Sequence, residues 1–318
     1  MNECDIQEHQ TAIYRTRKLD PPRVMTGKER RRIDPHKGLI KLLERNMDIL
    51  VSRFLYPHLS RVWNPYSWLL EKRFGLAQAS VSPANWPQDI DPIRVLLISD
   101  IHTGIFLKPH TLGKIFLALM ELGPDLVAIG GDIVSGHSSE VGPYLDAFAQ
   151  LSHAPLGAWY CYGNHDYFDG HPEEIQRQLR SIGITTLRNE SVVLRRRRGE
   201  FILGAIDDLI LGKPDWNSLI SQYGPPHLLL AHNPDHFYEA EVRGIPLTLS
   251  GHTHGGQIRF PNGPPIIRQS RFCLDEGIYS FHSSMLIVSR GLGCVVLPWR
   301  WGADPEAILI DILPSGGH

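Results

Sequence analysis

The chain has 318 residues, of which 42% are hydrophobic and 21% are charged. This composition is that of a globular protein with a buried core, and it excludes a disordered or fibrous chain. The net charge of −2 argues against nucleic acid as a partner, because nucleic-acid-binding chains usually carry an excess of basic residues.

The cysteines and the apolar runs bear on where the protein works. The 4 cysteines are widely spaced and form no CxxC pair, which favours a reducing compartment and hence a cytoplasmic location. A helix that crosses a bilayer needs roughly 20 consecutive apolar residues. Because charged residues interrupt every long apolar stretch, we expect no transmembrane segment.

The N-terminal residues differ in character from the rest of the chain. Residues 1–36 are polar, rich in charge and broken by prolines, so we interpret them as a mobile charged arm. The largely basic run at 28–32 is interpreted as solvated surface, with attraction to anionic lipid or nucleic acid as the alternative.

Residues 37–92 are predicted to form an N-terminal extension and linker. Over 37–56 apolar residues recur at steps of three and four, which predicts an amphipathic helix. The residues from there to about 75 are rich in aromatic and cationic side chains, a composition that suits a membrane surface, a lid or a dimer contact equally well. Prolines in 80–92 then indicate a linker.

From residue 93 short apolar runs of strand length follow one another. They are continuous rather than alternating, which is typical of strands buried on both faces. Helical patterns at 112–122, 141–152 and 172–182 separate several of them. We therefore predict a catalytic domain over 93–318, built as a layered α/β-β/α sandwich with helices outside, plus the helical N-terminal extension. The predicted strands are 95–98, 126–129, 158–162, 201–206, 227–231, 246–249, 285–288 and 307–312.

Five of the apolar runs end in residues of the types that bind metals. Each cluster alone is more typical of turn or capping chemistry than of a ligand. Because the carboxyl ends of neighbouring strands meet at one crevice, the five together predict a metal site. The clusters are Asp100-Ile-His102, Gly131-Asp132, Gly163-Asn164-His165-Asp166, Ala231-His232-Asn233 and Gly251-His252-Thr253-His254-Gly255.

In this order the clusters match the pattern D-x-H, G-D, G-N-H-D/E, H, G-H-x-H. The chain from about residue 93 to 313 thereby resembles the calcineurin-like metallophosphoesterases. The segment 251–257, the later Ser289-Arg290-Gly291-Leu292-Gly293 and the final Pro305-Glu306-Ala307 resemble the bacterial YkuE/YaeI-type phosphodiesterase branch.

The resemblance implies seven ligands for two divalent metal ions. Two metals about 3.5 to 4 Å apart need a shared oxygen ligand, and mixed oxygen and imidazole donors suit manganese, iron or zinc. The implied reaction is attack on phosphorus by a hydroxide that bridges the metals. One ion would be held by Asp100, His102 and His254, the other by Asn164, His232 and His252, and Asp132 would bridge them.

Other residues near the clusters are candidates for supporting roles. His165 resembles the family's histidine that stabilises developing charge or protonates the leaving oxygen. Asp166 either orients His165 or caps a helix. Arg290, in a glycine-rich turn, is a candidate phosphate contact, with an ordinary surface arginine as the alternative. Asp207 and its neighbour Asp208 are candidates for supporting the ligands.

These observations predict a phosphodiesterase or pyrophosphohydrolase that acts on a phosphoester substrate. The aromatic and cationic extension makes an amphiphilic substrate the specific hypothesis, such as the nucleotide-linked lipid UDP-2,3-diacylglucosamine, with peripheral contact to a membrane surface through residues 37–75. The alternatives are a phosphomonoesterase or protein phosphatase of the same fold, and a non-catalytic metal-binding scaffold.

Overall fold

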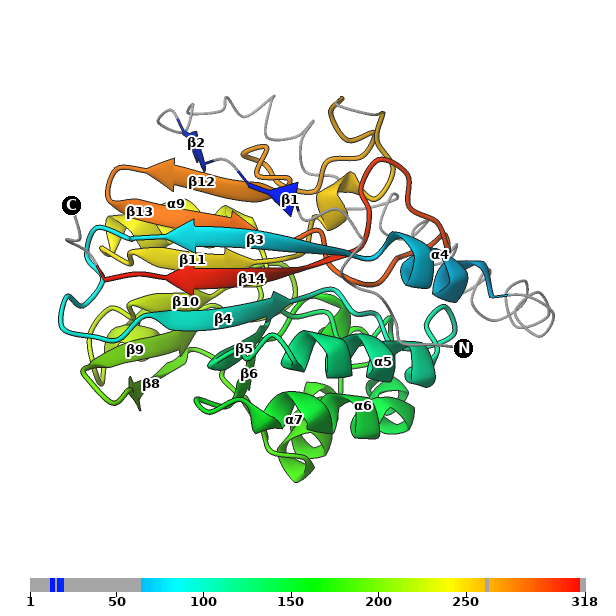
Figure 1. The fold of residues 1–318 in the computed structure, drawn as a ribbon, viewed down its shortest axis with the longest axis horizontal. Helices are drawn as coiled ribbons and strands as arrows, with labels where there is room; N and C mark the ends of the chain where they lie inside the picture. The colour runs from blue at the N-terminus through cyan, green and yellow to red at the C-terminus, as the bar shows by residue number, and fades with distance from the viewer. Residues whose placement is uncertain (1–11, 15, 20–63, 261–262, 315–318) are drawn as a thin grey trace.

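The computed structural model describes residues 12–14, 16–19, 64–260 and 263–314. In this part of the chain two seven-stranded sheets pack face to face, and helices cover their outer faces (Figure 1). The predicted α/β-β/α sandwich is confirmed.

The first sheet carries the N-terminal half of the site. Its neighbouring strands are parallel except for one antiparallel pair, β14 with β4. In spatial order its strands are β1 (Ala12–Ile13), β3 (Gly75–Val81), β14 (Glu306–Ile312), β4 (Ile93–Ile98), β5 (Leu126–Ile129), β6 (Ala158–Tyr160) and β7 (Ile184–Thr186).

The second sheet carries the C-terminal half of the site. Its antiparallel pairs are β12 with β13 and β8 with β9, and its other neighbours are parallel. In spatial order its strands are β2 (Thr16–Lys18), β12 (Gly277–Phe281), β13 (Ser284–Val288), β11 (Leu247–Ser250), β10 (Leu228–Leu230), β9 (Glu200–Ala205) and β8 (Glu190–Arg195).

The main core lies between the two sheets. Val95 and Leu97 of β4 pack in one cluster with Leu203, Leu228 and Leu249 of the opposite sheet, and all five have no exposed surface. Alternate residues of β4 and β5 face the helical layer instead and are equally buried. Burial on both faces is why β5 and the residues of β4 from Val95 onward are apolar.

Helices cover both outer faces. On the first sheet lie α5 (Pro109–Met120), α6 (Leu145–Ala149) and α7 (Pro172–Ser181), as predicted. Helix α4 (Pro65–Arg73) packs into the same cluster. The predicted helix at 141–152 is divided, with a 3-10 turn at Ser138–Tyr144 before α6 and another at Gln150–His153 after it. Helices α8 (Trp216–Ile220) and α9 (Phe237–Val242) pack on the second sheet.

The N-terminal part differs from the prediction in two respects. The short strands β1 and β2 lie within the expected mobile arm, yet each pairs with a sheet edge. Strand β3 lies within the expected extension and linker, yet it pairs with β14 along its whole length. Three of its seven residues are alanine or glycine, which give a weak apolar signal.

The remaining N-terminal predictions are not tested by the described residues. The amphipathic helix predicted over 37–56 lies outside them, and the three-part division of the chain stays a prediction. Among the described residues, no helix has the length and apolar character that crossing a membrane requires.

Candidate metal centre

The structure brings the seven predicted ligands together between the two sheets. All are buried, with 6% or less of each residue exposed. Each follows the carboxyl end of a strand, and these strands are parallel neighbours within each sheet. Asp100 and His102 follow β4, Asp132 follows β5, Asn164 follows β6, His232 follows β10, and His252 and His254 follow β11.

Two groups of three ligand atoms form among these seven residues. In each group the atoms lie within 4.8 Å of one another, and the groups are Asp100, His102 and His254, and Asp132, His232 and His252. The Nε2 atoms of His102 and His254 are 3.1 Å apart. Asp132 Oδ2 lies 3.1 Å from His232 Nε2 and 3.8 Å from His102 Nε2. Asp132 therefore stands between the groups, where a shared ligand is needed.

The donor atoms fit a pair of divalent ions. Asn164 Oδ1 is buried and accepts no hydrogen bond from any described residue, and burial of such an oxygen is costly unless a donor or a cation meets it. His232 donates from Nδ1 to the carbonyl oxygen of Gly130 at 2.7 Å, which directs Nε2 towards Asp132. Carboxylate, amide and imidazole donors together suit a borderline transition metal.

Electrostatics in the cluster also favour cation binding. Burial lowers the pKa of His102 and of His254 well below the usual range, so both rings are neutral, as a metal ligand must be. Burial alone would lower the pKa of His232, but the negative charges of Asp132 and Asp100 raise it to about 10. His232 and His165 in turn hold the pKa of Asp132 well below its usual range, against the effect of burial.

The backbone at the ligands adopts a conformation that ordinary residues rarely take. Five of the seven have a positive φ, between 49° and 72°, namely Asp100, His102, Asp132, His252 and His254. Such left-handed residues cost of order 1–3 kcal/mol each and persist only where the surrounding structure fixes them. The fold holds these side chains in place at a cost in stability, which is typical of functional sites.

Two positions in the motifs must be glycine because the loops that carry the ligands approach each other closely there. A Cβ on Gly163 would lie 2.2 Å from Asp132 Oδ1, and a Cβ on Gly251 would lie 2.3 Å from Asp100 Oδ2. Each glycine immediately precedes a predicted ligand, Asn164 or His252, and touches the carboxylate of another. Any side chain at either position would displace that carboxylate.

Asp166 supports the site in a way that neither sequence interpretation anticipated. It is fully buried and accepts hydrogen bonds from four backbone N–H groups at 2.8 to 3.3 Å, those of Asp132, Ile133, Val134 and Gly163. One carboxylate thus joins the loop after β5 to the loop after β6. It positions Asp132 and Asn164 relative to each other.

His165 lies beside the ligand cluster. Its Nδ1 donates to the carbonyl oxygen of Ser135 at 2.8 Å, and its backbone N–H donates to Asp132 Oδ1 at 2.8 Å. Its ring forms an edge contact with His102 at a centroid distance of 4.6 Å. Because Nδ1 is committed to Ser135, Nε2 is the ring nitrogen that remains free to act, and His165 also forms a group of possible metal ligands with His102 and Asp132.

Asp207 lies in the loop after β9. Its carboxylate accepts a hydrogen bond from the hydroxyl of Tyr167, and a second from the backbone N–H of Lys213 at 2.8 Å. It thereby links this loop to the segment that contains His165. Asp208 accepts from the N–H groups of Ile210 and Leu211 and stabilises the same loop.

Arg290 lies in the predicted glycine-rich turn, where it pairs with carboxylates. Its Nη2 pairs with the buried Glu306 at 2.6 Å, and its Nε lies 3.8 Å from Glu276. Its backbone N–H also donates to Glu306. These carboxylates neutralise its charge, so the structure does not support Arg290 as a phosphate contact.

Arg300 is a site residue that the sequence reasoning missed. It has no exposed surface, and its Nη2 donates to Nδ1 of His254 at 2.9 Å. It also donates to the carbonyl oxygens of Gly293, His254 and Ala303. The sequence contains no signal for it, because an arginine between Trp299 and Trp301 would be expected to be exposed and the tryptophans buried, whereas the structure has the reverse.

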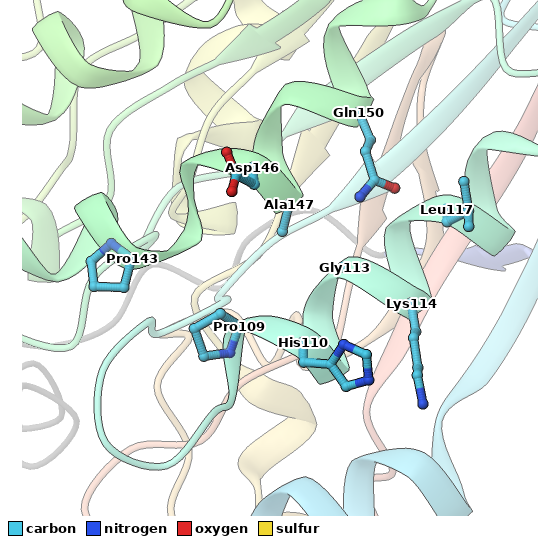
Figure 2. A pocket seen from close by; sticks show the side chains of 9 residues that line it. All are labelled: Pro109, His110, Gly113, Lys114, Leu117, Pro143, Asp146, Ala147 and Gln150. Atoms are coloured by element: carbon cyan, nitrogen blue, oxygen red, sulfur yellow. The ribbon is translucent and has the colours of Figure 1, made fainter.

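A surface pocket of about 370 Å³ lies between α5 and α6 (Figure 2). Its lining includes Pro109, Lys114, Leu117, Asp146 and Gln150 and none of the predicted site residues. The predicted site residues thus lie apart from this pocket.

Comparison with known proteins agrees with this geometry. A family model described as Calcineurin-like phosphoesterase matches residues 93–256. The chain is 34% identical over 236 residues to the uncharacterized metallophosphoesterase YkuE of Bacillus subtilis (strain 168), covering 71% of this chain and 81% of the relative. It is 31% identical over 231 residues to phosphodiesterase YaeI of Escherichia coli (strain K12), covering 70% of this chain and 83% of the relative.

A solved structure, that of a 5'-nucleotidase precursor from Thermus thermophilus, aligns with a TM-score of 0.41 at 10% identity, over 70% of this chain and 55% of that one. The family match covers the segment with all the ligand clusters, and the two curated relatives are covered over most of their length. The chain therefore belongs to the calcineurin-like phosphoesterase family and is a metal-dependent phosphoester hydrolase.

Proposed function

We propose that this protein is a phosphodiesterase or pyrophosphohydrolase that works with two divalent ions. The observation that carries the proposal is the pair of buried ligand groups joined at Asp132, whose Oδ2 lies within 4 Å of a histidine from each group. The name of the Escherichia coli relative, a phosphodiesterase, supports a diester as substrate.

Each ligand has a defined place in this proposal. Asp100, His102 and His254 would hold one ion, Asn164, His232 and His252 the other, and Asp132 both. We expect manganese, iron or zinc, because the donors mix oxygen with imidazole nitrogen. When bound, the two ions lower the pKa of water to make a nucleophile and offset the charge on the phosphate.

His165 is the proposed acid. Its Nδ1–H is held by Ser135, and its backbone N–H is held by Asp132, so the ring keeps one orientation at the edge of the cluster. In the imidazolium form it donates the Nε2 proton to the leaving oxygen of the ester. Asp166 and Asp207 hold the loops around this ring rather than the ring itself.

The substrate that we propose is amphiphilic, with a nucleotide-linked lipid such as UDP-2,3-diacylglucosamine as the specific candidate. The aromatic and cationic composition of residues 56–74 supports this only in part, because Tyr66 and Phe74 are buried in the core while Trp68 stays exposed, and exposed aromatic side chains favour the interface of a membrane. The protein would then work at a membrane surface in the cytoplasm.

The first experiment measures bound metal and diester hydrolysis together. Purified protein loaded with Mn²⁺ should bind two ions per chain and hydrolyse bis-4-nitrophenyl phosphate faster than 4-nitrophenyl phosphate. Asp132→Asn should lose one or both ions and nearly all turnover, since the shared ligand is neutralised. Asp146→Asn, on α6 and outside the ligand cluster, is the matched control and should behave as the wild type.

Three outcomes would contradict the proposal. Faster turnover of the monoester would favour a phosphomonoesterase, and two bound ions with no turnover of any phosphoester would favour a non-catalytic scaffold. Full activity in Asp132→Asn would show that this ligand cluster is not the active site. Hydrolysis of UDP-2,3-diacylglucosamine no faster than that of a simple diester would leave the reaction class intact but reject the lipid candidate.

A further inference from the structure

Exposed apolar side chains gather on the loops that surround the metal centre. Of the fifteen large apolar residues that are exposed in the described part of the chain, ten lie on loops that follow β4, β6, β9, β11 and β13. Strands β9 and β13 are parallel neighbours of β10 and β11, which carry ligands, so these loops leave the sheets at the same edge as the ligands. The ten residues are Ile105, Phe168, Leu209, Leu211, Phe260, Ile266, Ile267, Leu297, Trp299 and Trp301.

Six of the ten form what we call the apolar shelf, on the loops after β11 and β13. They are between 44% and 67% exposed, and they are Phe260, Ile266, Ile267, Leu297, Trp299 and Trp301. Backbone hydrogen bonds join the loops, from Trp301 to Gln257 at 2.9 Å and from Arg259 to Trp301 at 2.8 Å. The rings of Phe260 and Trp301 are in edge contact, with centroids 5.8 Å apart. The two loops that carry the six side chains are therefore joined, with Phe260 and Trp301 in direct contact, and exposed apolar side chains on such loops mark a candidate binding site.

The shelf is connected directly to a predicted metal ligand. Arg300 lies between the two exposed tryptophans, and its buried guanidinium donates to His254. Gln257, three residues after His254, donates from Nε2 to the carbonyl oxygen of Val295 at 2.9 Å. Across the cluster, the exposed ring of Phe168 lies 4.3 Å from that of His165. A phosphate held at the metals would thus have the ring of Phe168 beside His165 on one side and the loop that carries the two tryptophans next to His254 on the other.

The charges around the shelf indicate which partner it fits. The loops after β11 and β13 contain five arginines and no lysine. Four of them are paired with carboxylates or buried, namely Arg259, Arg268, Arg290 and Arg300. The fifth, Arg271, is exposed, and its charge is partly offset by the nearby carboxylate of Asp235. Since most of this positive charge is neutralised, the shelf offers apolar contact with little attraction for an anionic bilayer.

We propose that the apolar shelf binds the hydrocarbon chain of an amphiphilic phosphoester whose phosphate lies at the metal centre. This inference rests on the proposed function and adds to it the surface that selects the substrate. The shelf determines specificity for chain length, and the metal centre determines the reaction.

The experiment uses two homologous series on Mn²⁺-loaded full-length protein. The first is alkyl 4-nitrophenyl phosphate diesters from methyl to octyl, each below its micelle concentration, for which kcat/KM is measured. The second is alkylphosphonates of the same lengths, whose binding is measured by calorimetry without turnover. We expect both kcat/KM and affinity to rise on the order of two-fold per methylene, about half the free energy of complete burial.

Two double variants test whether the dependence on chain length comes from the shelf or from exposed apolar side chains elsewhere. In Ile266→Ala/Trp299→Ala the ratio of octyl to methyl kcat/KM, and the same ratio of phosphonate affinities, should fall at least five-fold. The matched control is Leu117→Ala/Val242→Ala, which removes two exposed apolar side chains from α5 and α9. It should keep the wild-type ratios.

The possible results are distinct. A flat dependence on chain length in the wild type, or a wild-type ratio in the shelf variant, would overturn the inference. Loss of binding to phosphatidylglycerol vesicles in the shelf variant, with the chain-length ratio unchanged, would also overturn it and make the shelf a bilayer contact. Failure to hydrolyse even the methyl diester would instead count against the proposed function, while the phosphonate series would still test the shelf.

Discussion

Arg300 donates from Nη2 to Nδ1 of His254 at 2.9 Å, and no part of the arginine is exposed. A second hydrogen bond, from Nη1, reaches the carbonyl oxygen of His254. The arginine thereby fixes both the ring and the backbone of a predicted ligand whose φ is 52°. Because arginine can only donate, the bond to Nδ1 leaves the proton of the neutral ring on Nε2, the atom that faces the predicted metal site, so this bond belongs to the metal-free ring. The bond to the carbonyl oxygen does not depend on the tautomer, and it holds the backbone of the ligand in place.

We predict that Arg300→Lys weakens one of the two metal sites. Lysine keeps the charge but cannot bond His254 and Gly293 at the same time. The weaker of the two Mn²⁺ dissociation constants, measured by calorimetry on metal-stripped protein, should rise roughly 10- to 100-fold. Arg290→Lys, which changes a paired arginine outside the cluster, is the control. Two unaltered affinities in Arg300→Lys would show that the arginine serves the fold alone.

Asp166→Asn should cost both stability and activity. The carboxylate accepts four backbone N–H groups, and the asparagine amide would present a donor to some of them. We expect a loss of about 2–4 kcal/mol in the free energy of unfolding, measured by urea denaturation. Asp169→Asn, at a partly exposed carboxylate that accepts two backbone N–H groups, should lose less than half as much. Equal losses in the two variants would contradict the role given to Asp166.

Gly251→Ala should disrupt the metal centre. The new methyl group would lie 2.3 Å from Asp100 Oδ2, so that the carboxylate must move. Overpacking of this kind costs about 1–3 kcal/mol, and bound metal, counted by elemental analysis, should fall below two ions per chain. Gly136→Ala introduces a methyl group with no atom within 4 Å and should bind two. A Gly251→Ala protein with two ions would mean that the loop accommodates the methyl group.

The sequence predicted well those elements whose type and position follow from a single local pattern of residues. Strand β5 and the part of β4 from Val95 onward are buried on both faces, so their residues are apolar, and the ligands follow shortly after each strand ends. Strand β3 had no such signal, because its alanines bury little apolar surface and its place in the sheet depends on pairing with the last strand, β14.

The two arginines show where sequence reasoning was insufficient. Arg290 stands in a glycine-rich turn near the end of a strand, as a phosphate contact would, but Glu306 of β14 pairs with it. Arg300 lies outside every motif, yet folding places it on His254, 46 positions earlier in the chain. Both outcomes depend on long-range contacts that a pattern of neighbouring residues does not encode.

The last prediction concerns the dependence of stability on pH. His236 is buried, with 2% of its surface exposed, and its Nε2 donates to the carbonyl oxygen of Asp207 at 3.2 Å. Burial lowers its pKa to about 4, whereas the unfolded value is about 6.5. Because the unfolded state binds the proton more tightly, the contribution of His236 is complete above about pH 6.5 and is lost as the pH falls towards 4.

His236→Gln should therefore lose less stability on acidification than the wild type. Glutamine keeps a donor for Asp207 but does not titrate, so the difference between the two proteins isolates this residue from all other groups. Between pH 7.5 and 5 the wild type should lose about 2 kcal/mol more than the variant, measured by urea denaturation in the presence of a chelator. Parallel curves over this range would mean that the ring is already protonated, or accessible to water, in the folded protein.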